Sequence, residues 1–531
     1  MRGAKQTQLL ATSVLFAAVV FAFVPTFLAI VIWVAIAWTI GGLVARVNIR
    51  QAAAIGRVVF AMVVGALVLN APWVSQFANS KWMDQFIGSQ AASIQRVGLA
   101  QLAQFDGGLL RFGIIALGLY IPVFVSVVVT RSTTFIWATR SLSLVVLTGM
   151  LIVVIDANVL NIAAPNFGQL LAIVACGLAL GAGALASFVF DDELTLAYRW
   201  WKPVVSCAVI ASCIGVMPAV SMAVGGSWNQ SQTAIADLYT QLQANPPEGD
   251  YNVVYVGRSE VLPISAMRVT DTVAFAVADD GELTMRDRWV KPSELSNNVE
   301  SALHAIIWRE TVRGGRLLAP LAVRYVVVPQ IDGGESTISK PLPLPEGLLA
   351  ALSTQLDFRR VYIASDLVIY ENMAWVPSLS VLDENSSALS KQAGDEVLLS
   401  SELRSAMPIA RIDDAASVAT EVGASTVYLA VPFSDRLRLE VSGADVRPRV
   451  AFGGTTAFDV VDGGLATLRY SKPLSQYFFV LVQSLLWLLV IIAVFDIGRI
   501  KRRLLRARKR EVIVVGSNDS PALSFAVEGD Q

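Results

Sequence analysis

Two long apolar runs divide this sequence, VVSCAVIASCIGVMPAVSMAV at residues 204–224 and FFVLVQSLLWLLVIIAVFDI at residues 478–497. Between them lies Ser227–Gln476, a long segment in which polar and apolar residues are mixed. A helix needs about 20 predominantly apolar residues to cross the hydrocarbon core of a membrane. The pattern therefore predicts a large polar domain held at both ends by membrane helices.

The composition of the whole chain also indicates a membrane protein. Of its 531 residues, 55% are hydrophobic and only 16% are charged, and the mean hydropathy is +0.59. The formal net charge of -1 hides an asymmetry, because Lys and Arg gather beside certain apolar runs while the acidic residues lie mostly in the polar segment. A multi-pass α-helical membrane protein is expected, and an ordinary soluble enzyme is excluded.

Hydrophobic periodicity and length predict about eight membrane spans. Pro25 interrupts a first apolar stretch that is too long for one helix, so two spans are expected there, with one kinked helix as the alternative. The more polar segment 73–108 is expected to lie at the membrane interface. The predicted spans are residues 9–24, 27–44, 58–72, 109–129, 142–155, 167–190, 204–224 and 478–497.

The positions of the basic residues orient these spans. With eight spans both termini lie on one side, and the Arg-rich short loops fall on that same side, which the positive-inside rule identifies as cytoplasmic. Residues 227–476 are then extracytoplasmic, and the tail 499–531 is a basic cytoplasmic tail. The basic positions are Arg2, Lys5, Arg46, Arg50, Arg57, Arg131, Arg140 and the run between Arg499 and Arg510.

The chain therefore divides into a membrane domain and an outer domain. Residues 1–226 form the predicted seven-span membrane domain, and 477–498 the eighth transmembrane helix. In the outer segment, strands alternating with helices predict an α/β module over 227–382. After a linker at 383–394, short strands separated by Gly, Asp and Pro turns predict an antiparallel β-sandwich over 395–476.

Several kinds of chemistry have no sequence signal. The chain has no Asp-x-Asp motif to hold a divalent cation on a nucleotide sugar, and a Ser/His/Asp site would have to use the single histidine, His304. Cys176, Cys207 and Cys213 lie in apolar runs and are expected to be buried, and His304 is expected to pack in a helix. No metal and no cofactor are predicted.

The candidate site residues are charged groups at the outer ends of the spans. An enzyme that uses a lipid-linked sugar needs a carboxylate as general base and a cation to hold the donor phosphate. Asp106, Asp156 and Asp84 are the candidate catalytic residues, and Arg111 and Arg96 the candidate substrate-binding residues. The alternative interpretation is that they are solvated loop charges, with a helix start near Arg111.

Several short stretches resemble a known family. Gly315–Leu318, Val323–Val328 and Leu367–Asn372 followed by Trp375–Pro377 resemble the outer domain of large actinobacterial polytopic membrane glycosyltransferases and, more distantly, YfhO-type membrane proteins. Ala71–Trp73 and Trp487 fit the same resemblance. Full-length members of the group carry an N-terminal family-2 transferase domain on the cytoplasmic side, so the chain is similar to their C-terminal membrane and extracytoplasmic half.

These observations predict a plasma-membrane protein of cell-envelope polysaccharide or glycolipid assembly. It is expected either to transfer a sugar from a polyprenyl-phosphate donor on the outer face, or to be the membrane subunit of a separate cytoplasmic glycosyltransferase. The expected partners are membrane lipids, the polyprenyl-phosphate sugar and an envelope glycan, and no nucleic acid. The alternative is a non-catalytic, membrane-anchored glycan-binding or scaffold protein. A transporter ranks third, because few charges lie at mid-membrane.

Overall fold

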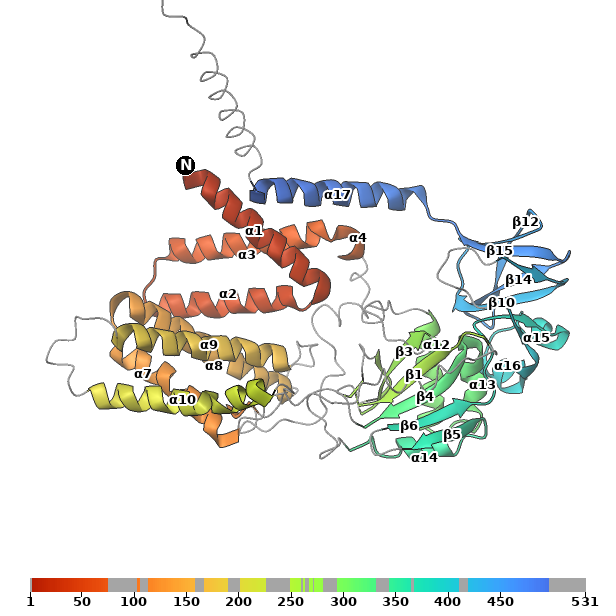
Figure 1. The fold of residues 1–531 in the computed structure, drawn as a ribbon, viewed down its shortest axis with the longest axis horizontal. Coiled ribbons are helices and arrows are strands. Elements are labelled where there is room, and N and C mark those ends of the chain that lie inside the picture. Colours follow the sequence, from red (N-terminus) through yellow and green to blue (C-terminus); the bar gives the residue numbers. More distant parts are fainter. Residues whose placement is uncertain are drawn as a thin grey trace, which may run out of the picture. The chain divides into compact units, whose positions relative to one another are not determined.

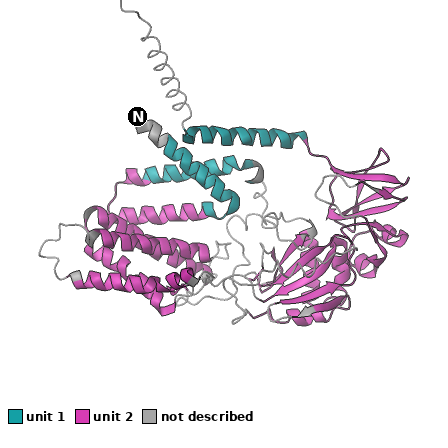
Figure 2. Cartoon of the chain, viewed as in Figure 1, with its two compact units in different colours: residues 1–28, 53–76, 474–531 teal, residues 29–52, 77–473 magenta. Residues whose placement is uncertain are grey.

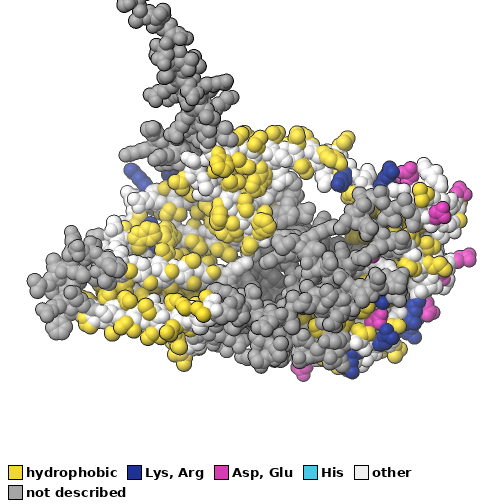
Figure 3. All heavy atoms as spheres, in the orientation of Figure 1, with side chains coloured by type: hydrophobic (Ala, Val, Ile, Leu, Met, Phe, Trp, Pro, Cys, Tyr) yellow, Lys and Arg dark blue, Asp and Glu magenta, His cyan; other side chains and the backbone are white. Residues whose placement is uncertain are grey.

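A computed structural model of the chain shows long helices and, in a separate region, three β-sheets (Figure 1). Hydrophobic side chains cover the long helices, whereas charged side chains gather over the strands (Figure 3). The structure describes residues 2–74, 103–105, 113–157, 167–189, 201–225, 249–258, 261–262, 267–270, 272–279, 294–330, 343–363, 367–409 and 419–495.

In the part of the chain that the structure describes, six helices are long and apolar enough to cross a membrane, judged by length and composition. The protein is therefore membrane-embedded and multi-pass. Two shorter apolar helical segments, Gln8–Phe23 and Gly113–Val129, lie where further spans were predicted. The six helices, given by their apolar parts, are Phe27–Val44, Ile49–Leu69, Thr133–Ile155, Gly168–Ser187, Pro203–Ser221 and Leu474–Phe495.

The break at Pro25 is confirmed. Helix α1 (Arg2–Phe23) ends two residues before the proline, and α2 (Phe27–Val44) begins two residues after it. Proline has no backbone N–H to continue the helical hydrogen bonds. The turn is closed by the Phe27 N–H, which donates to the Val24 carbonyl at 3.0 Å.

The predicted fourth span, 109–129, is not one continuous helix. Its described part is a 3₁₀-helix η2 (Gly113–Leu119), then Tyr120, then α7 (Ile121–Val129). Pro122 lies in the first turn of α7, where a missing N–H costs nothing. The Tyr120-Ile121-Pro122 sequence therefore starts a new helix inside an apolar run.

The fifth span begins earlier than predicted. Helix α8 (Ser132–Asp156) starts ten residues before the expected residue 142, so Arg140 lies inside the helix and not in a loop. The prediction started the span after the last charge. Residues 132–139 nevertheless read STTFIWAT, and they continue the helix without a turn signal.

The chain forms two compact units (Figure 2). Unit 1 comprises residues 1–28, 53–76 and 474–531 and holds α1, most of α3 (Ile49–Leu69), α4 (Ala71–Val74) and α17 (Leu474–Phe495). Unit 2 comprises residues 29–52 and 77–473. It holds most of α2, the helices η2 to α10, and all the strands.

In unit 1, polar side chains fasten the last helix to the end of α3. The carbonyl of Leu69 accepts hydrogen bonds from Gln483 Nε2 at 3.0 Å and from Trp487 Nε1 at 2.9 Å, both on α17. Asn70 Nδ2 donates to the Ala18 carbonyl on α1 at 3.1 Å. The last carbonyls of a helix lack helical partners, so the two bonds to Leu69 satisfy a group that would otherwise be unpaired.

The membrane helices of unit 2 pack through small residues. Gly177 and Gly181 on α9 (Phe167–Val189) form a Gly-x-x-x-Gly pair, and Ser141 Oγ on α8 donates to the Gly177 carbonyl at 2.7 Å. Trp33 Nε1 on α2 also donates to Thr148 Oγ1 on α8, at 3.1 Å. Close backbone approach and interhelical hydrogen bonds are the usual attraction between helices in lipid. Helix α10 (Lys202–Gly225) completes this group.

The first sheet is mixed and has six strands in the order β2-β3-β1-β4-β6-β5. Only the central pair β1–β4 is parallel; its other neighbours pair antiparallel. Helices α12 (Glu294–Ile307), α13 (Gly314–Leu318) and α14 (Leu348–Ser353) contribute residues to the core on one face. The strands are β1 (Asn252–Gly257), β2 (Met267–Arg268), β3 (Ala274–Asp279), β4 (Val323–Pro329), β5 (Phe358–Ile363) and β6 (Leu367–Asn372).

Two antiparallel sheets follow, in the orders β13-β14-β10-β7-β8 and β12-β11-β15-β9. One hydrophobic core joins them, with Phe458 and Val427 from the first and Leu439 and Ala466 from the second. The strands are β7 (Leu379–Leu382), β8 (Met407–Pro408), β9 (Ala419–Val422), β10 (Ser425–Pro432), β11 (Leu437–Val441), β12 (Ala444–Val446), β13 (Pro448–Ala451), β14 (Thr455–Val460) and β15 (Gly464–Tyr470).

The predicted boundary between the outer modules cuts through this second part. Strand β7 was placed in the α/β module, but it pairs with β10, and the predicted linker 383–394 contains the helix α15 (Glu384–Leu389). A shared hydrophobic cluster also joins the two parts, with Ala319 and Val376 against Tyr428 and Phe452. Pairing of strands far apart in sequence overrides the local composition change on which the boundary was based.

Candidate functional site

The predicted site residues lie almost entirely outside the described residues. Asp84, Arg96, Asp106 and Arg111 fall in undescribed segments. Asp156 is the last residue of α8, and its side chain is not described. The basic tail 499–531 also lies outside the described residues. The structure therefore neither brings these charges together nor separates them.

The described helices of unit 2 instead enclose an apolar cavity of about 510 Å³. This volume falls within the roughly 300–1,000 Å³ of ordinary small-molecule sites. Its walls come from α8, from α9, from the junction of η2 with α7, and from residue 103. The lining residues are Ala103, Tyr120, Val145, Gly149, Met150, Ile152, Val153, Val154, Leu171 and Val174.

Two local features leave this space open. Gly149 has no side chain, and a Cβ added there would meet no atom within 4 Å. The break between η2 and α7 places Tyr120 in the wall, with its ring centroid 6.4 Å from that of Phe105. Met150 is 61% exposed, so the cavity reaches the outer surface of the described helices.

The chemistry of the lining suits a hydrocarbon. Among the described lining residues, Tyr120 alone carries a hydroxyl group, and none carries a charge. No group of three His, Cys, Asp or Glu side chains in the described part of the chain could hold a metal ion. The cavity can therefore bind an apolar chain, but none of its described lining side chains could act as a general base at neutral pH.

The ends of the cavity wall adjoin two predicted carboxylates in the sequence. Ala103 precedes Asp106 by three residues, and Val154 precedes Asp156 by two. Sequence reasoning missed the cavity itself. Gly149 inside an apolar helix and Tyr120 two residues before Pro122 were the signals that could have indicated it.

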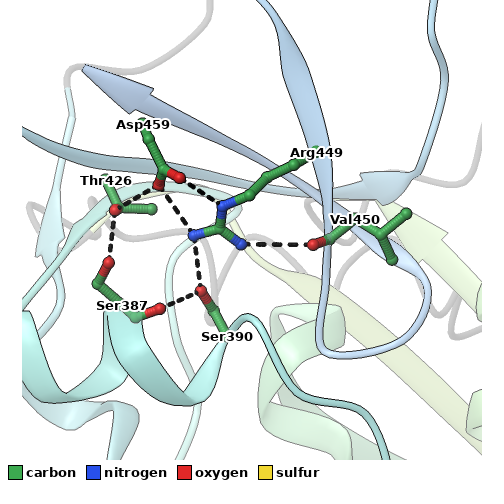
Figure 4. A network of polar contacts seen from close by, with 6 residues as sticks. All are labelled: Ser387, Ser390, Thr426, Arg449, Val450 and Asp459. Carbon is green, nitrogen blue, oxygen red and sulfur yellow. Dashed lines mark hydrogen bonds and ion pairs between the residues drawn. The ribbon is translucent and has the colours of Figure 1, made fainter. Parts of the chain in front are cut away.

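A polar network among the described residues joins α15 to the five-stranded antiparallel sheet (Figure 4). Arg449 on β13 donates two hydrogen bonds to the carboxylate of Asp459 on β14, from Nε at 2.8 Å and from Nη2 at 3.0 Å. Thr426 on β10 donates to the same carboxylate at 2.9 Å. The network continues to Ser387 on α15, at 2.6 Å from Thr426, so it fastens that helix to the sheet.

This network has a stability role with a defined pH dependence. The hydrogen bond from Arg449 holds the pKa of Asp459 below its usual range. A carboxyl whose pKa is lower in the folded state stabilises the fold above its unfolded pKa of about 3.9. That stabilisation is lost as the pH falls through the folded value.

Replacing Asp459 by asparagine is expected to lower the free energy of unfolding by about 1 kcal/mol at pH 7. The effect is small because the carboxylate is half exposed and water screens its charge. In the full-length variant, the amide hydrogens of β10 and β14 should exchange faster than in the wild type. Lowering the pH below 4 should reduce their protection less in the variant than in the wild type. Asp462→Asn, at an exposed turn, is the matched control. Equal exchange in the two variants would contradict this role.

The remaining single-residue expectations also have outcomes. His304 lies in α12 as expected, with its ring centroid 5.7 Å from that of Trp308, but its side chain is 49% accessible and Nδ1 lies 4.0 Å from Glu310. The three cysteines are exposed on α9 and α10. Their apolar surroundings in the sequence arise because these helices present hydrophobic side chains outward.

Comparisons of the chain with protein-family models, with curated proteins and with solved structures gave no match.

Proposed function

We propose that the chain is a membrane glycosyltransferase, or the membrane subunit of one, in cell-envelope polysaccharide or glycolipid assembly. Its sugar donor would be a polyprenyl phosphate used on the outer face of the membrane. The observation that carries this proposal is the apolar cavity of about 510 Å³, whose wall adjoins Asp106 and Asp156 in sequence. An isoprenoid chain is pure hydrocarbon and matches such a lining.

The proposal includes the full topology. Eight spans would result if Gln8–Phe23 and the segment ending at Val129 also cross the membrane. Both termini would be cytoplasmic and residues 227–476 extracytoplasmic, with their two antiparallel sheets forming a sandwich. Contacts between Trp33 and Thr148 and between Trp38 and Arg140 make α2 and α8 antiparallel, which supports alternating spans.

In this proposal each part of the site has one role. The cavity would hold the isoprenoid chain beside Tyr120. Asp106 or Asp156 would take the proton from the acceptor hydroxyl, and Arg111, with Arg96, would hold the donor phosphate. A neutral cavity below a charged rim would orient the donor with its phosphate outward.

The test uses the full-length protein in lipid nanodiscs with a polyprenyl-phosphate sugar carrying a labelled sugar. Gly149→Leu fills the cavity without a collision and is expected to reduce donor binding about tenfold or more, because the isoprenoid loses its site. Gly183→Leu is the matched control, since a Cβ there also meets no atom within 4 Å and the residue does not line the cavity. Equal donor binding by both variants would refute the lipid site.

Single changes of Asp84, Asp106 and Asp156 to Asn separate the catalytic version from the alternative. Loss of a general base should lower sugar transfer by roughly 10²–10⁴-fold at one of them, with donor binding kept. Unchanged envelope glycans in all three variants would exclude a catalytic role for these residues. Glycan binding without any transfer would favour the non-catalytic glycan-binding or scaffold protein.

A further inference from the structure

A second feature of the membrane helices lies at the opposite end of α8 from Asp156. Arg140 is half-buried in this helix, and its guanidinium carbon lies 4.9 Å from the ring centroid of Trp38 on α2 and 6.0 Å from that of Trp137. The two indoles meet edge to face, with centroids 5.4 Å apart. The cation is therefore held beside two aromatic rings.

The depth of Arg140 corresponds to the membrane interface. Helices α2 and α8 cross at Gly41, where an added Cβ would lie 2.7 Å from the Cα of Arg140. Gly41 is three residues before the end of α2 at Val44, a rise of about 4.5 Å. Tryptophan and arginine at this depth are typical of the layer that holds lipid headgroups.

The guanidinium has no partner among the described residues. Its Nε is buried without a hydrogen bond, and no described carboxylate lies within ion-pair distance. Asp156, the one acidic residue in the described membrane helices, is sixteen residues further along α8, about 24 Å away. An arginine always carries its charge, so an anion would add a charge-assisted partner to the two indole rings.

Gly42 covers the side of the guanidinium that faces α2, and of the guanidinium nitrogens Nε alone is buried, so an anion would reach Nη1 and Nη2. The Cβ position of Gly42 lies 3.4 Å from Nε and from Nη2 of Arg140, so a larger side chain would crowd the donor edge of the guanidinium. Arg46 and Arg131 lie at this same end of the antiparallel pair, because α2 ends at Val44 and α8 starts at Ser132. These described cations at the same helix ends favour an anionic ligand such as a phosphate.

We propose that Arg140, flanked by Trp38 and Trp137, binds the phosphate of an anionic membrane phospholipid in the leaflet where α8 begins. The guanidinium presents a planar fork of N–H donors that matches two phosphate oxygens. The indole of Trp38 supports its face, and the exposed Trp137 lies at headgroup level. This lipid site is separate from the cavity at the other end of α8 and does not depend on the proposed function.

The test measures phospholipid selectivity of the full-length protein by native mass spectrometry from detergent micelles. The protein is titrated with dioleoyl phosphatidylglycerol and with dioleoyl phosphatidylcholine, and retained lipids are counted. The wild type should prefer phosphatidylglycerol, and Arg140→Gln should reduce this preference about tenfold, the loss expected for a charge-assisted phosphate contact. Arg131→Gln removes a charge at the same end of α8 and should keep the preference within about twofold.

Three outcomes would overturn the proposal. The first is equal selectivity of Arg140→Gln and the wild type, and the second is an equal loss in Arg140→Gln and Arg131→Gln, which would indicate only general charge attraction. The third concerns Asp191, Asp192 and Glu193, the carboxylates that follow α9. If neutralising these three residues abolishes the effect of Arg140→Gln, Arg140 is paired within the protein.

A conservative variant keeps the test decisive if Arg140→Gln fails to fold. Arg140→Lys keeps the charge near the same depth, but an ammonium cannot form a bidentate fork. Arg140→Lys should prefer phosphatidylglycerol less than the wild type and Arg131→Gln do. Its preference should still be stronger than that of Arg140→Gln. Full wild-type selectivity in Arg140→Lys would refute direct phosphate recognition by the guanidinium.

Discussion

Replacing Asn372 by alanine is expected to lower the free energy of unfolding of the β-sheet region by about 3 kcal/mol. Asn372 is fully buried at the end of β6, and its Nδ2 donates to the carbonyls of Gly315 and Val323, both at 2.9 Å. Its Oδ1 accepts from the Ala374 N–H at 3.0 Å. Alanine would leave three buried backbone groups unsatisfied, and a small cavity would add to the cost.

Pulse proteolysis in urea on the full-length protein measures this change. Asn385→Ala is the control, because Asn385 is exposed in the first turn of α15 and the same atoms are removed there. The urea midpoint for unfolding of the β-sheet region should fall strongly in Asn372→Ala. In Asn385→Ala it should stay within experimental error of the wild type. A shift of the same size in both would show that Asn372 is not a structural centre.

This buried asparagine also explains the motifs on which the family resemblance was based. Asn372 joins Gly315 to Val323, the beginnings of two of those stretches. Arg324, next to Val323, has its guanidinium carbon 4.7 Å from the ring centroid of Trp375 in the third. The short motifs are therefore parts of one packing unit, and their spacing reflects architecture and not catalysis.

Replacing Gly181 by leucine is expected to separate α9 from α7 and α8 and to cost more than about 3 kcal/mol. A Cβ at this position would lie 2.5 Å from Val123 Cγ2, 2.7 Å from Ser141 Oγ and 3.0 Å from the Cα of Val123. The last atom is backbone, so a side-chain rotation cannot relieve the collision. The variant should lose its folded peak in detergent gel filtration and melt at a lower temperature.

Gly183→Leu provides an internal control on the same helix. Gly183 lies two residues further on and is exposed, and a Cβ there meets no atom within 4 Å. The two variants share the same change in side-chain volume and in helix propensity. Equal thermal stability of both would mean that α9 does not pack on α7 and α8 through this face.

The parts of the fold that local patterns determine were predictable. Apolar length located α2 to within a residue, and a proline break separated it from α1. Strands alternating with helices were predicted over residues 227–382, and β1, β4 and the β5–β6 hairpin lie there. These features depend on residues within one element, so a single sequence contains the information.

The parts that depend on distant partners were not predictable. Strand β7 looks like the end of the α/β module, yet its partner β10 begins more than forty residues later. Hydropathy alone also does not show the early start of α8 at Ser132 or the 3₁₀-helix before Tyr120. Local hydropathy is the same for a long helix and for one broken in the middle.

For the candidate site, the sequence indicated charges and the structure supplied a cavity. Asp106 and Asp156 could be named because an acid beside an apolar run stands out in a sequence. A cavity, in contrast, is formed by residues that are absent, such as the missing side chain of Gly149, and by walls from three distant segments. The hydrophobic periodicity of a sequence does not reveal a cavity between its helices.

The hydrogen bonds that close unit 1 set an order of events during biosynthesis. The Leu69 carbonyl emerges early from the ribosome, but its partners Gln483 and Trp487 follow 414 and 418 residues later. At about 5–20 residues per second, translation needs roughly 20–80 s to supply them. During that interval α1 and α3 lack their neighbour α17. Packing of α17 against the end of α3 is therefore the last step in the assembly of unit 1.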